Sequence, residues 1–379
     1  MAQQDHIAAL GVAAECWSST APLTIVEPDG DGHRLMYVAR LAEAAAARGV
    51  SIMVVLSASG RRSPEFDEFL APVQHIFKLR VLPDCRPISD YLNQTAHGRP
   101  ILLDGDRYLR ALIRQRPPSG TVILLMRARM KGARGVIGCL LKAVIAAFLI
   151  LFSAARVVRL SSSTQGTDCS RLLRWLPFVV DPDPVRAEPF SADETSNLPL
   201  LPGRYALVAG RIDDRKSVAH LIDWVINTGL DDVSLVLAGR TTDKVRANID
   251  SRLTPPRSSS VVVIDRFMTD AELLHLYSRA AAVMCLYENE GPSGAVTFAR
   301  LVGVPVIAWG SRQLIAQASE AGILVLCADR STASIDIAVE AALAKSRPAS
   351  KHNGQEADLF AAPLLALAGS TSHAIQAEA

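Results

Sequence analysis

Residues 205–216 read YALVAGRIDDRK, and this stretch decides the fold of the second half of the chain. Its first five residues, Tyr205–Ala209, form an apolar run typical of a buried strand, and Gly210 ends that run. A helical pattern follows near Ser217–Asn227, and apolar runs then alternate with helical patterns. This alternation predicts an α/β domain with a parallel sheet. The later strand-like runs are Ser234–Ala238, Val261–Ile264, Ala282–Leu286, Val304–Trp309 and Gly322–Cys327, with helical patterns near Asp270–Ala281 and Ala295–Val302.

The first half of the chain shows the same alternation. The strand-like run Leu23–Glu27 leads into a glycine-rich turn at residues 28–33, and a helical pattern then covers Arg34–Arg48. A strand, a glycine-rich turn, a helix and a second strand predict another α/β domain with a parallel sheet. The further strand-like runs are Ser51–Leu56, Ile101–Leu103, Val122–Met126 and Arg156–Leu160.

A segment rich in proline, serine and acidic residues separates the two halves. It runs from Asp181 to Leu201 and has the composition of a linker. We therefore predict an N-terminal domain at residues 1–180, a linker at 181–201, a C-terminal domain at 202–345 and a C-terminal tail at 346–379 of uncertain structure.

Composition limits the class of protein. The 379 residues are 49% hydrophobic and 21% charged, which provides apolar material for two cores. A net charge of only +2 argues against a general nucleic-acid-binding protein. The six cysteines are scattered singly, which argues against a zinc site and a disulfide framework, and favours a reducing, cytoplasmic compartment. Residues 1–17 carry acidic groups and lack a long apolar core, so we expect no signal peptide there.

Two cations follow the strand at 205–209. Arg211 comes directly after Gly210, and Lys216 lies five residues further on, at the expected start of a helix. Ligands of open α/β sheets bind at the carboxyl ends of the strands, where two cations can neutralise a diphosphate. An ordinary solvated loop is about as well supported by spacing alone, because Asp213 and Asp214 partly cancel the positive charge.

A turn of small residues precedes another helix. Residues 287–294 read YENEGPSG, and the free N–H groups at the start of the following helix could hold phosphate oxygens. Glu290 is placed to accept hydrogen bonds from sugar hydroxyls. The alternative is an acidic turn with no ligand, since a glycine-rich turn alone is weak evidence.

Taken together, these stretches resemble the donor-binding domain of glycosyltransferase family 4, which has the GT-B fold of two Rossmann-like α/β domains facing a cleft. The N-terminal half is similar to the same family through Glu27–Arg34, Leu41-Ala42 and Arg48-Gly49, and Trp175-Leu176-Pro177 with Asp181 resembles its connection between domains. The features of the C-terminal half that carry the resemblance are Gly210, Arg211 and Lys216; Val236–Gly239; Glu272, Leu273, Tyr277 and Ala280; Glu290 and Gly291; and Gly303 with Pro305–Ala308.

The resemblance implies a hexosyltransferase-type enzyme that moves a sugar from a nucleotide-sugar donor to an acceptor hydroxyl with retention of configuration, and that needs no metal or other cofactor. It implies that Arg211 and Lys216 hold the donor diphosphate and that Glu290 meets the sugar, which makes these three the expected catalytic set. The residues expected to bind the donor are Gly30, Gly32, Gly210, Gly291, Pro292, Ser293 and Gly294.

Two positions depart from the family pattern. The family places a second Glu eight residues after the first, to bind the ribose, and Phe298 stands there instead and cannot accept those hydrogen bonds. In the family, one strand of the N-terminal half often ends in His. This chain has Arg127 at that place, and an arginine can bind a phosphate but cannot act as a base. A catalytically inactive scaffold or partner subunit therefore stays open as an alternative.

The acceptor-side candidates lie in the N-terminal half. They are His33, Asp104, Asp106 and Arg127, which could contact an acceptor hydroxyl or a phosphate. Capping or packing roles are alternatives for His33 and for the two aspartates. A nicotinamide-dependent oxidoreductase is disfavoured, because no third glycine follows Gly30 and Gly32.

One apolar helix is expected at residues 136–155. Lys142 is its one charged residue, and basic residues flank it on both sides. We expect the strands on either side to belong to one sheet, which favours peripheral contact with a membrane over a spanning helix. Burial against a neighbour or a second subunit, or a membrane-anchored binding protein, stays open. We expect a peripheral protein at the cytoplasmic face of the cell membrane, acting on a lipid-linked or polysaccharide acceptor in cell-surface polysaccharide or glycolipid synthesis.

Overall fold

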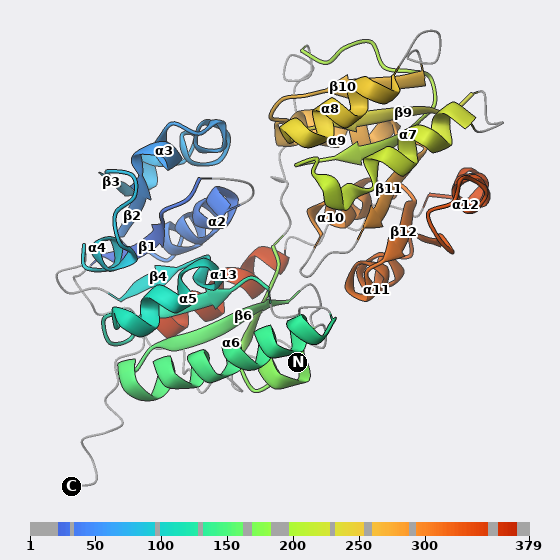
Figure 1. Cartoon of the computed structure of the whole chain (residues 1–379). Helices are drawn as coiled ribbons and strands as arrows, with labels where there is room; N and C mark the ends of the chain where they lie inside the picture. The colour runs from blue at the N-terminus through green and yellow to red at the C-terminus, as the bar shows by residue number, and fades with distance from the viewer. Residues whose placement is uncertain are drawn as a thin grey trace, which may run out of the picture. The chain divides into compact units, whose positions relative to one another are not determined.

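The structure is a computed structural model of the 379-residue chain. It describes residues 22–30, 34–94, 99–127, 132–161, 169–182, 197–227, 232–253, 260–287, 293–347 and 355–369. The chain divides into two compact units. Met1–Pro182 and Gly354–Ala379 form the first unit, and Asp183–Asn353 form the second (Figure 1).

The first unit is built on a seven-stranded parallel sheet of order β3-β2-β1-β4-β5-β6-β7. The strand order runs outward in one direction from β1 to β3 and in the other from β4 to β7, which is the order of a doubly wound Rossmann-like sheet. The strands are β1 (Leu23–Glu27), β2 (Ile52–Ser57), β3 (Lys78–Leu82), β4 (Pro100–Leu102), β5 (Val122–Leu125), β6 (Arg156–Ser161) and β7 (Phe178–Val180).

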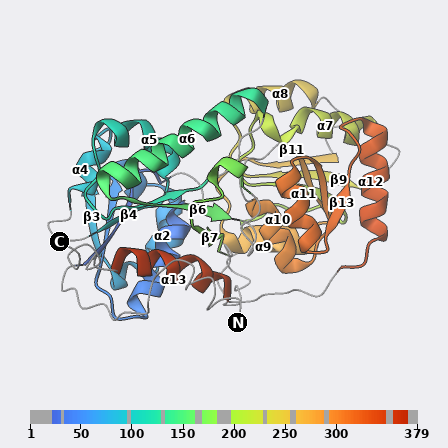
Figure 2. The same ribbon diagram turned by 90° about the horizontal axis from the view of Figure 1, so that it is seen from below.

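Helices cover both faces of this sheet, so its central strands are buried on both sides and carry apolar runs without alternation. Figure 2 shows α5 and α6 on one face and α2 and α13 on the other. The helices of the unit are α2 (Arg34–Ala46), α3 (Ala58–Arg61), η1 (Phe66–Leu70), η2 (Gln74–Ile76), α4 (Ile88–Leu92), α5 (Gly105–Arg114), α6 (Gly132–Ser153), η3 (Arg171–Leu173) and α13 (Gln355–Gly369).

The second unit repeats the plan with six parallel strands in the order β10-β9-β8-β11-β12-β13. The helices α7, α8 and α12 pack on one face, and α9, α10 and α11 pack on the other. Its strands are β8 (Tyr205–Ala209), β9 (Ser234–Ala238), β10 (Val261–Ile264), β11 (Ala282–Tyr287), β12 (Val306–Gly310) and β13 (Leu324–Leu326). Its helices are η5 (Asp214–Lys216), α7 (Val218–Asn227), α8 (Asp243–Arg252), α9 (Asp270–Arg279), α10 (Gly294–Val302), α11 (Arg312–Glu320) and α12 (Thr332–Ala344).

The C-terminal segment differs from its expectation as a tail. Residues 355–369 form α13, which packs against α2 and β7 of the first unit. The ring of Phe360 is buried against that of Tyr37, with 5.4 Å between the ring centroids. The first unit is therefore assembled from the two ends of the described chain, and the second unit is formed by the residues between them.

Candidate functional site

Two glycines shape the loop that follows β8. Gly210 has φ +82° and Gly239, after β9, has φ +137°, a region of the backbone map that L side chains rarely adopt. A Cβ atom on Gly239 would overlap the carbonyl group of Gly210, so the two strand ends can approach each other only because residue 239 has no side chain. The backbone of Ile212 then continues beside that of Thr241, which fixes the path of the loop carrying Arg211.

The acidic residues of this loop are paired with other cations. Asp213 binds Arg215 at 2.7 Å, and Asp214 binds Lys244 at 2.7 Å. In the part of the chain that the structure describes, Arg211 is exposed and has no ion-pair partner. The charge cancellation that would make this an ordinary solvated loop therefore does not involve Arg211.

Lys216 is held at the same edge of the sheet. Its ammonium group donates a hydrogen bond to the carbonyl oxygen of Ala209 and lies 5.6 Å from the centre of the Tyr287 ring. Burial lowers the pKa of Lys216 to about 8, against the opposing influence of the Cys285 thiol and Asp213, which favour the charged form. The cation is thus only weakly solvated, and its charge state responds to a neighbouring anion.

Tyr287 connects Lys216 to the start of α10. The Tyr287 hydroxyl and the Ser293 hydroxyl are 3.2 Å apart, while the Tyr287 ring faces the Lys216 ammonium. Ser293 is the N-cap residue of α10, and Gly294 is the first helical residue. Arg211, Lys216, Ser293 and Gly294 thus belong to one edge of one sheet, where strands β8 and β11 end.

One amide at this helix start is already occupied. The Ser293 N–H donates to Oε1 of Gln317 at 3.1 Å, and the Gln317 amide nitrogen donates to the Thr297 hydroxyl at 3.3 Å. Sequence reasoning included Tyr287 in the turn at 287–294 but gave it no role, although it is the last residue of a strand at the expected edge. Gln317 was missed, because it comes from α11 and no spacing rule places it there.

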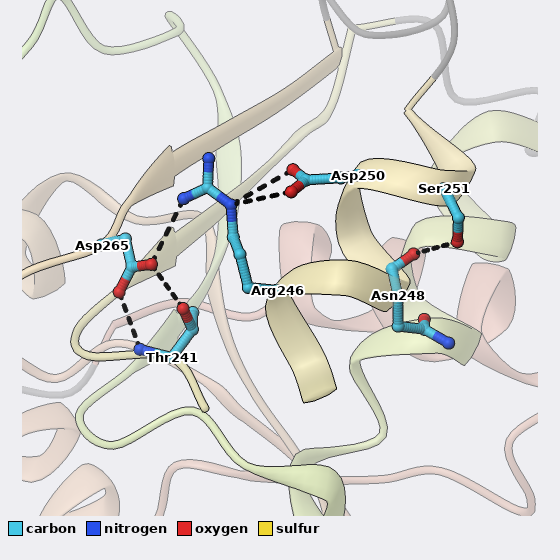
Figure 3. Close-up of polar contacts among 6 residues, drawn as sticks. All are labelled: Thr241, Arg246, Asn248, Asp250, Ser251 and Asp265. Atoms are coloured by element: carbon cyan, nitrogen blue, oxygen red, sulfur yellow. Dashed lines mark hydrogen bonds and ion pairs between the residues drawn. The ribbon is translucent and has the colours of Figure 1, made fainter. Parts of the chain in front are cut away.

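Further along the same edge of the sheet, an ion-pair network joins the loops after β9 and β10 to α8 (Figure 3). Asp265, after β10, accepts the Thr241 N–H at 2.8 Å and the Arg246 guanidinium at 3.2 Å, and Asp250 also binds Arg246 at 3.1 Å. Ser251 donates to the Asn248 carbonyl oxygen at 2.9 Å further along α8. Thr241 is hydrogen-bonded to Asp265, and its backbone pairs with that of Ile212. The network therefore also supports the loop that carries Arg211.

Five predicted site residues lie outside the described residues: Gly32, His33, Glu290, Gly291 and Pro292. Their proposed roles stay predictions.

The acceptor-side carboxylates are held in ion pairs within the first unit. Asp104 is buried after β4 and binds the Arg34 guanidinium at 2.8 Å. Asp106, in the first turn of α5, binds the Lys142 ammonium of α6 at 2.6 Å and accepts the Arg127 N–H at 2.8 Å. The Arg127 side chain is exposed at the end of β5. Asp106 therefore joins the loop after β5 to α5 and α6.

Gly30 has a packing reason for being glycine. A Cβ atom there would lie 2.7 Å from the Cα of Gly60 and 2.8 Å from the hydroxyl oxygen of Ser63. The turn after β1 therefore rests directly on α3 and the residues that follow it. A contact between Gly30 and the donor stays a prediction.

Glu27, which sequence reasoning did not single out as a site residue, is a fully buried carboxylic acid at the end of β1. Its Oε1 accepts the Asp29 N–H at 3.1 Å, and its Oε2 has no hydrogen-bond partner among the described residues. Burial raises the pKa of Glu27 well above its ordinary value, opposed by the nearby Arg34 and assisted by Asp104. Its position in an apolar strand gave no sign of this, because a strand's last residue usually reads as the beginning of a turn.

Phe298 belongs to the hydrophobic core. It is buried in α10 and stacks on Tyr277 of α9, with 5.3 Å between ring centroids and 25° between the ring planes. A ribose-binding carboxylate at this position would need a polar opening, and the core offers none at Phe298. Within the described ranges, no group of three His, Cys, Asp or Glu side chains has the geometry to hold a metal ion.

Solved structures resemble the chain over most of its length. HepE of Anabaena in complex with UDP is 14% identical with a TM-score of 0.59, over 91% of this chain and 94% of that one. Sucrose-phosphate synthase of Thermosynechococcus elongatus is 16% identical with a TM-score of 0.61, over 92% and 95% of the two chains. WaaG, a glycosyltransferase involved in lipopolysaccharide biosynthesis, is 14% identical with a TM-score of 0.53, over 91% and 94%.

The structural neighbours also include a putative UDP-N-acetylglucosamine 2-epimerase of Listeria monocytogenes, 14% identical with a TM-score of 0.56, over 89% and 94% of the two chains. No protein-family model matches the sequence, and no curated protein matches it either. At these identities the likeness establishes the architecture. The two parallel sheets, their shared strand order and these neighbours show that the chain has the GT-B fold of two Rossmann-like α/β domains.

Proposed function

We propose that this protein is a retaining glycosyltransferase that moves a sugar from a nucleotide-sugar donor to an acceptor hydroxyl without a metal or other cofactor. The observation that carries the proposal is the cationic edge of the second unit. Arg211 is not paired with the acids of its own loop, and Lys216 lies over Tyr287, whose hydroxyl is next to the start of α10. Two cations beside a helix N-terminus form a site suited to two linked phosphates.

The mechanism follows the chemistry of the family that the sequence resembles. The bond between the anomeric carbon and the phosphate oxygen breaks, and Arg211 and Lys216 neutralise the charge that develops on the departing diphosphate. The acceptor oxygen forms its bond to the same face of the sugar, and its proton passes to the departing phosphate oxygen. Glu290 would bind the sugar hydroxyls, and the free amides at the start of α10 would bind phosphate.

A uridine diphosphate sugar is the first donor to test. HepE was crystallised with UDP, with UDP and glucose, and with UDP-glucose. We also propose that the protein works at the cytoplasmic face of the cell membrane, on a lipid-linked or polysaccharide acceptor. The exposed apolar helix α6 supports that location, and the role of WaaG in lipopolysaccharide biosynthesis supports that class of acceptor.

A second candidate function is a catalytically inactive scaffold that partners an active transferase. The burial of Phe298 favours it, because the position where the family binds the ribose is filled by core packing. Loss of the two ribose hydrogen bonds weakens donor binding unless other groups replace them.

The two candidates are distinguished by nucleotide binding and turnover. We expect UDP or GDP to raise the melting temperature of the transferase, whereas an absence of any shift with every nucleotide would favour the scaffold. In a screen of nucleotide sugars for transfer and donor hydrolysis, we expect Lys216→Ala to lower the rate at least tenfold, about 1.4 kcal/mol. Product analysis separates transfer from epimerisation of the donor sugar.

Lys345→Ala is a matched control for this experiment. Its ammonium group also donates to a strand carbonyl oxygen, that of Leu324 at 2.8 Å, but Leu324 begins β13 and lies at the opposite edge of the same sheet. We expect this variant to keep the wild-type rate. Equal turnover of Lys216→Ala and wild type would remove Lys216 from the site.

A further inference from the structure

Helix α6 presents an apolar side to the outside of the first unit. Between Gly135 and Ser153 every exposed residue is apolar, including Ile137 at 66% and Leu151 at 75% exposure. A helix on the outer face of a sheet normally carries polar residues on its outward side, and a contiguous exposed apolar strip marks an interaction surface. The residues of this strip are Val136, Ile137, Leu140, Leu141, Val144, Leu151 and Phe152.

The same helix is fixed to the sheet along its other side. By length and composition alone, Gly135–Ser153 could cross a membrane. However, the strands before and after α6 are parallel neighbours in one sheet, with Val122 opposite Arg156, and Lys142 of α6 binds Asp106 of α5. A spanning helix would have to separate these strands and break that ion pair. The buried side of α6 includes Cys139, Ile145, Ala146, Leu149 and Ser153.

Unpaired cations border the strip on both sides. Helix α5, which precedes β5, packs against α6 (Figure 2), and η3, which follows β6, also packs against α6. Across α5, α6 and η3 there is one carboxylate, Asp106, and it is paired with Lys142. The exposed arginines with no ion-pair or hydrogen-bond partner among the described residues are Arg110, Arg114 and Arg116 at α5, and Arg171 and Arg174 at η3.

An aromatic residue completes the border at η3. Trp175 is 52% exposed, and its indole N–H donates to the Leu172 carbonyl oxygen at 2.9 Å, which fixes the ring beside an exposed leucine. Tryptophan with one apolar and one polar side is favoured at the boundary between water and lipid.

We propose that this surface, made of α5, the outward strip of α6 and residues 171–175, docks flat on an anionic lipid bilayer. The apolar strip enters the boundary between headgroups and acyl chains, and the arginines on both sides bind lipid phosphates. A second copy of the chain is a poorer occupant, because a symmetric dimer through this surface would bring the two sets of unpaired arginines together. This surface specifies the lipid that the protein would contact at the membrane location proposed above. Its binding to lipid does not depend on transferase activity.

Vesicle flotation of the full chain tests the proposal. We expect the protein to float with vesicles of phosphatidylcholine mixed with anionic phosphatidylglycerol, and to bind pure phosphatidylcholine vesicles at least about tenfold more weakly. Equal binding to both kinds of vesicle, or to neither, would overturn the assignment of an anionic bilayer as the partner.

The apolar contribution is tested by Ile137→Glu combined with Leu151→Glu. Both side chains are exposed, so the substitutions leave the core intact, and we expect binding to anionic vesicles to fall at least about tenfold. The matched control is Ile337→Glu on α12 of the second unit, where the side chain is 69% exposed. We expect the control to float like wild type, and an equal loss in both would contradict the proposal.

The cationic contribution is tested by replacing Arg110, Arg114, Arg171 and Arg174 with Gln together. We expect the preference for anionic vesicles to disappear, whereas Arg204→Gln with Arg279→Gln, two exposed cations of the second unit, should keep it. Sedimentation without lipid gives a further check, since a dimer dispersed by Ile137→Glu with Leu151→Glu would assign the strip to a second copy instead.

A nucleotide-induced melting shift is measured on every variant. A variant that keeps the shift but loses flotation has lost only the lipid contact. A wild-type protein that floats but shows no shift with any nucleotide would support this docking surface and count against the proposed transferase.

Discussion

Lys216 is a cation whose charge state changes within an accessible pH range. Burial lowers its pKa to about 8, and its ammonium group is the one that we assign to the donor diphosphate. Below that pH the group is charged and attracts phosphate, and above it the charge is lost. Arg211 supplies a second cation at this site, so the site keeps part of its attraction for an anion when Lys216 is neutral.

Nucleotide affinity should therefore fall as the pH rises above about 8, by at most about tenfold for each pH unit. Calorimetric titration with UDP from pH 7 to 9 measures this, because the phosphates of UDP are already ionised there and its uracil ring is still mostly neutral. In Lys216→Arg the cation persists, and we expect a nearly flat profile. Identical profiles for the variant and wild type would show that another group titrates.

Glu27 makes the free energy of unfolding depend on pH. The sign is opposite to that expected for an acid held in a salt bridge. Since burial raises its pKa, the folded chain binds a proton that the unfolded chain has released, and the free energy of unfolding falls as the pH rises through that window. The window begins at the unfolded value near 4.5 and ends at the raised folded value.

We expect Glu27→Gln to remove this loss. Relative to wild type, the variant should gain stability with increasing pH, by up to about 1.4 kcal/mol for each pH unit within the window, and stay level below it. Urea unfolding of both proteins at a series of pH values provides the measurement. A difference in stability that does not change with pH would mean that Glu27 is charged in the folded chain.

At the scale of elements, strand limits were predicted best from the sequence where the strands are buried and bounded by turn residues. The strands β8, β9 and β10 have the limits expected from their runs, which are apolar apart from Ser234, because helices pack on both faces of the sheet. Strand β3, of sequence KLRVL, was missed because it lies at the sheet edge and is largely exposed, with cations in alternate positions. Helix α8 was missed because only Val245 and Ile249 of its residues are buried.

The site shows the same division. Spacing along the chain indicated Arg211 and Lys216, because a strand end and a helix start are local features. It did not indicate that Arg215 and Lys244 would take up the two neighbouring acids, or that Gln317 would occupy the Ser293 amide, because these contacts join separate elements. Pairing between elements depends on tertiary packing, which local propensity does not contain.

Gly239, after β9, is required for the close approach of the ends of β8 and β9, and this can be tested. In Gly239→Ala the new Cβ would overlap the Gly210 carbonyl group at a φ of +137°, so the two strand ends must separate. We expect a loss of at least about 2 kcal/mol in the free energy of unfolding and weaker UDP binding, since the Arg211 loop moves. Gly322→Ala is the control: its φ is +72° with open space around it, and it should cost only about 1 kcal/mol. Equal losses would contradict the role of close approach.

At the scale of the whole molecule, the chain leaves the first unit and comes back to it. The apolar residues of α13 gave no sign of where they would pack, because their partners on α2 and β7 lie far earlier in the sequence. Phe360 and its neighbours Leu364 and Leu365 are buried there. The boundary of the first unit thus depends on a contact at long sequence separation.

We expect Phe360→Ala to destabilise the first unit by about 3–5 kcal/mol and to leave the second unit unchanged. Calorimetry should show the melting transition of one unit moving to lower temperature while the UDP-induced shift, which reports on the second unit, is kept. The control is Leu343→Ala, at a partly exposed position on α12. It should lower the free energy of unfolding of either unit by no more than about 1 kcal/mol. A joint shift of both transitions would show that the units unfold as one.

The return of α13 has a consequence for synthesis on the ribosome. The first unit is translated first, yet its surface on α2 and β7 stays uncovered until residues 355–369 have emerged, after the whole of the second unit. The second unit can therefore complete its folding before the first unit does. This reverses the usual order, in which domains fold from the N-terminus onward. Because an apolar surface is exposed during that interval, we expect the growing polypeptide to depend most on chaperones while its second half is being translated.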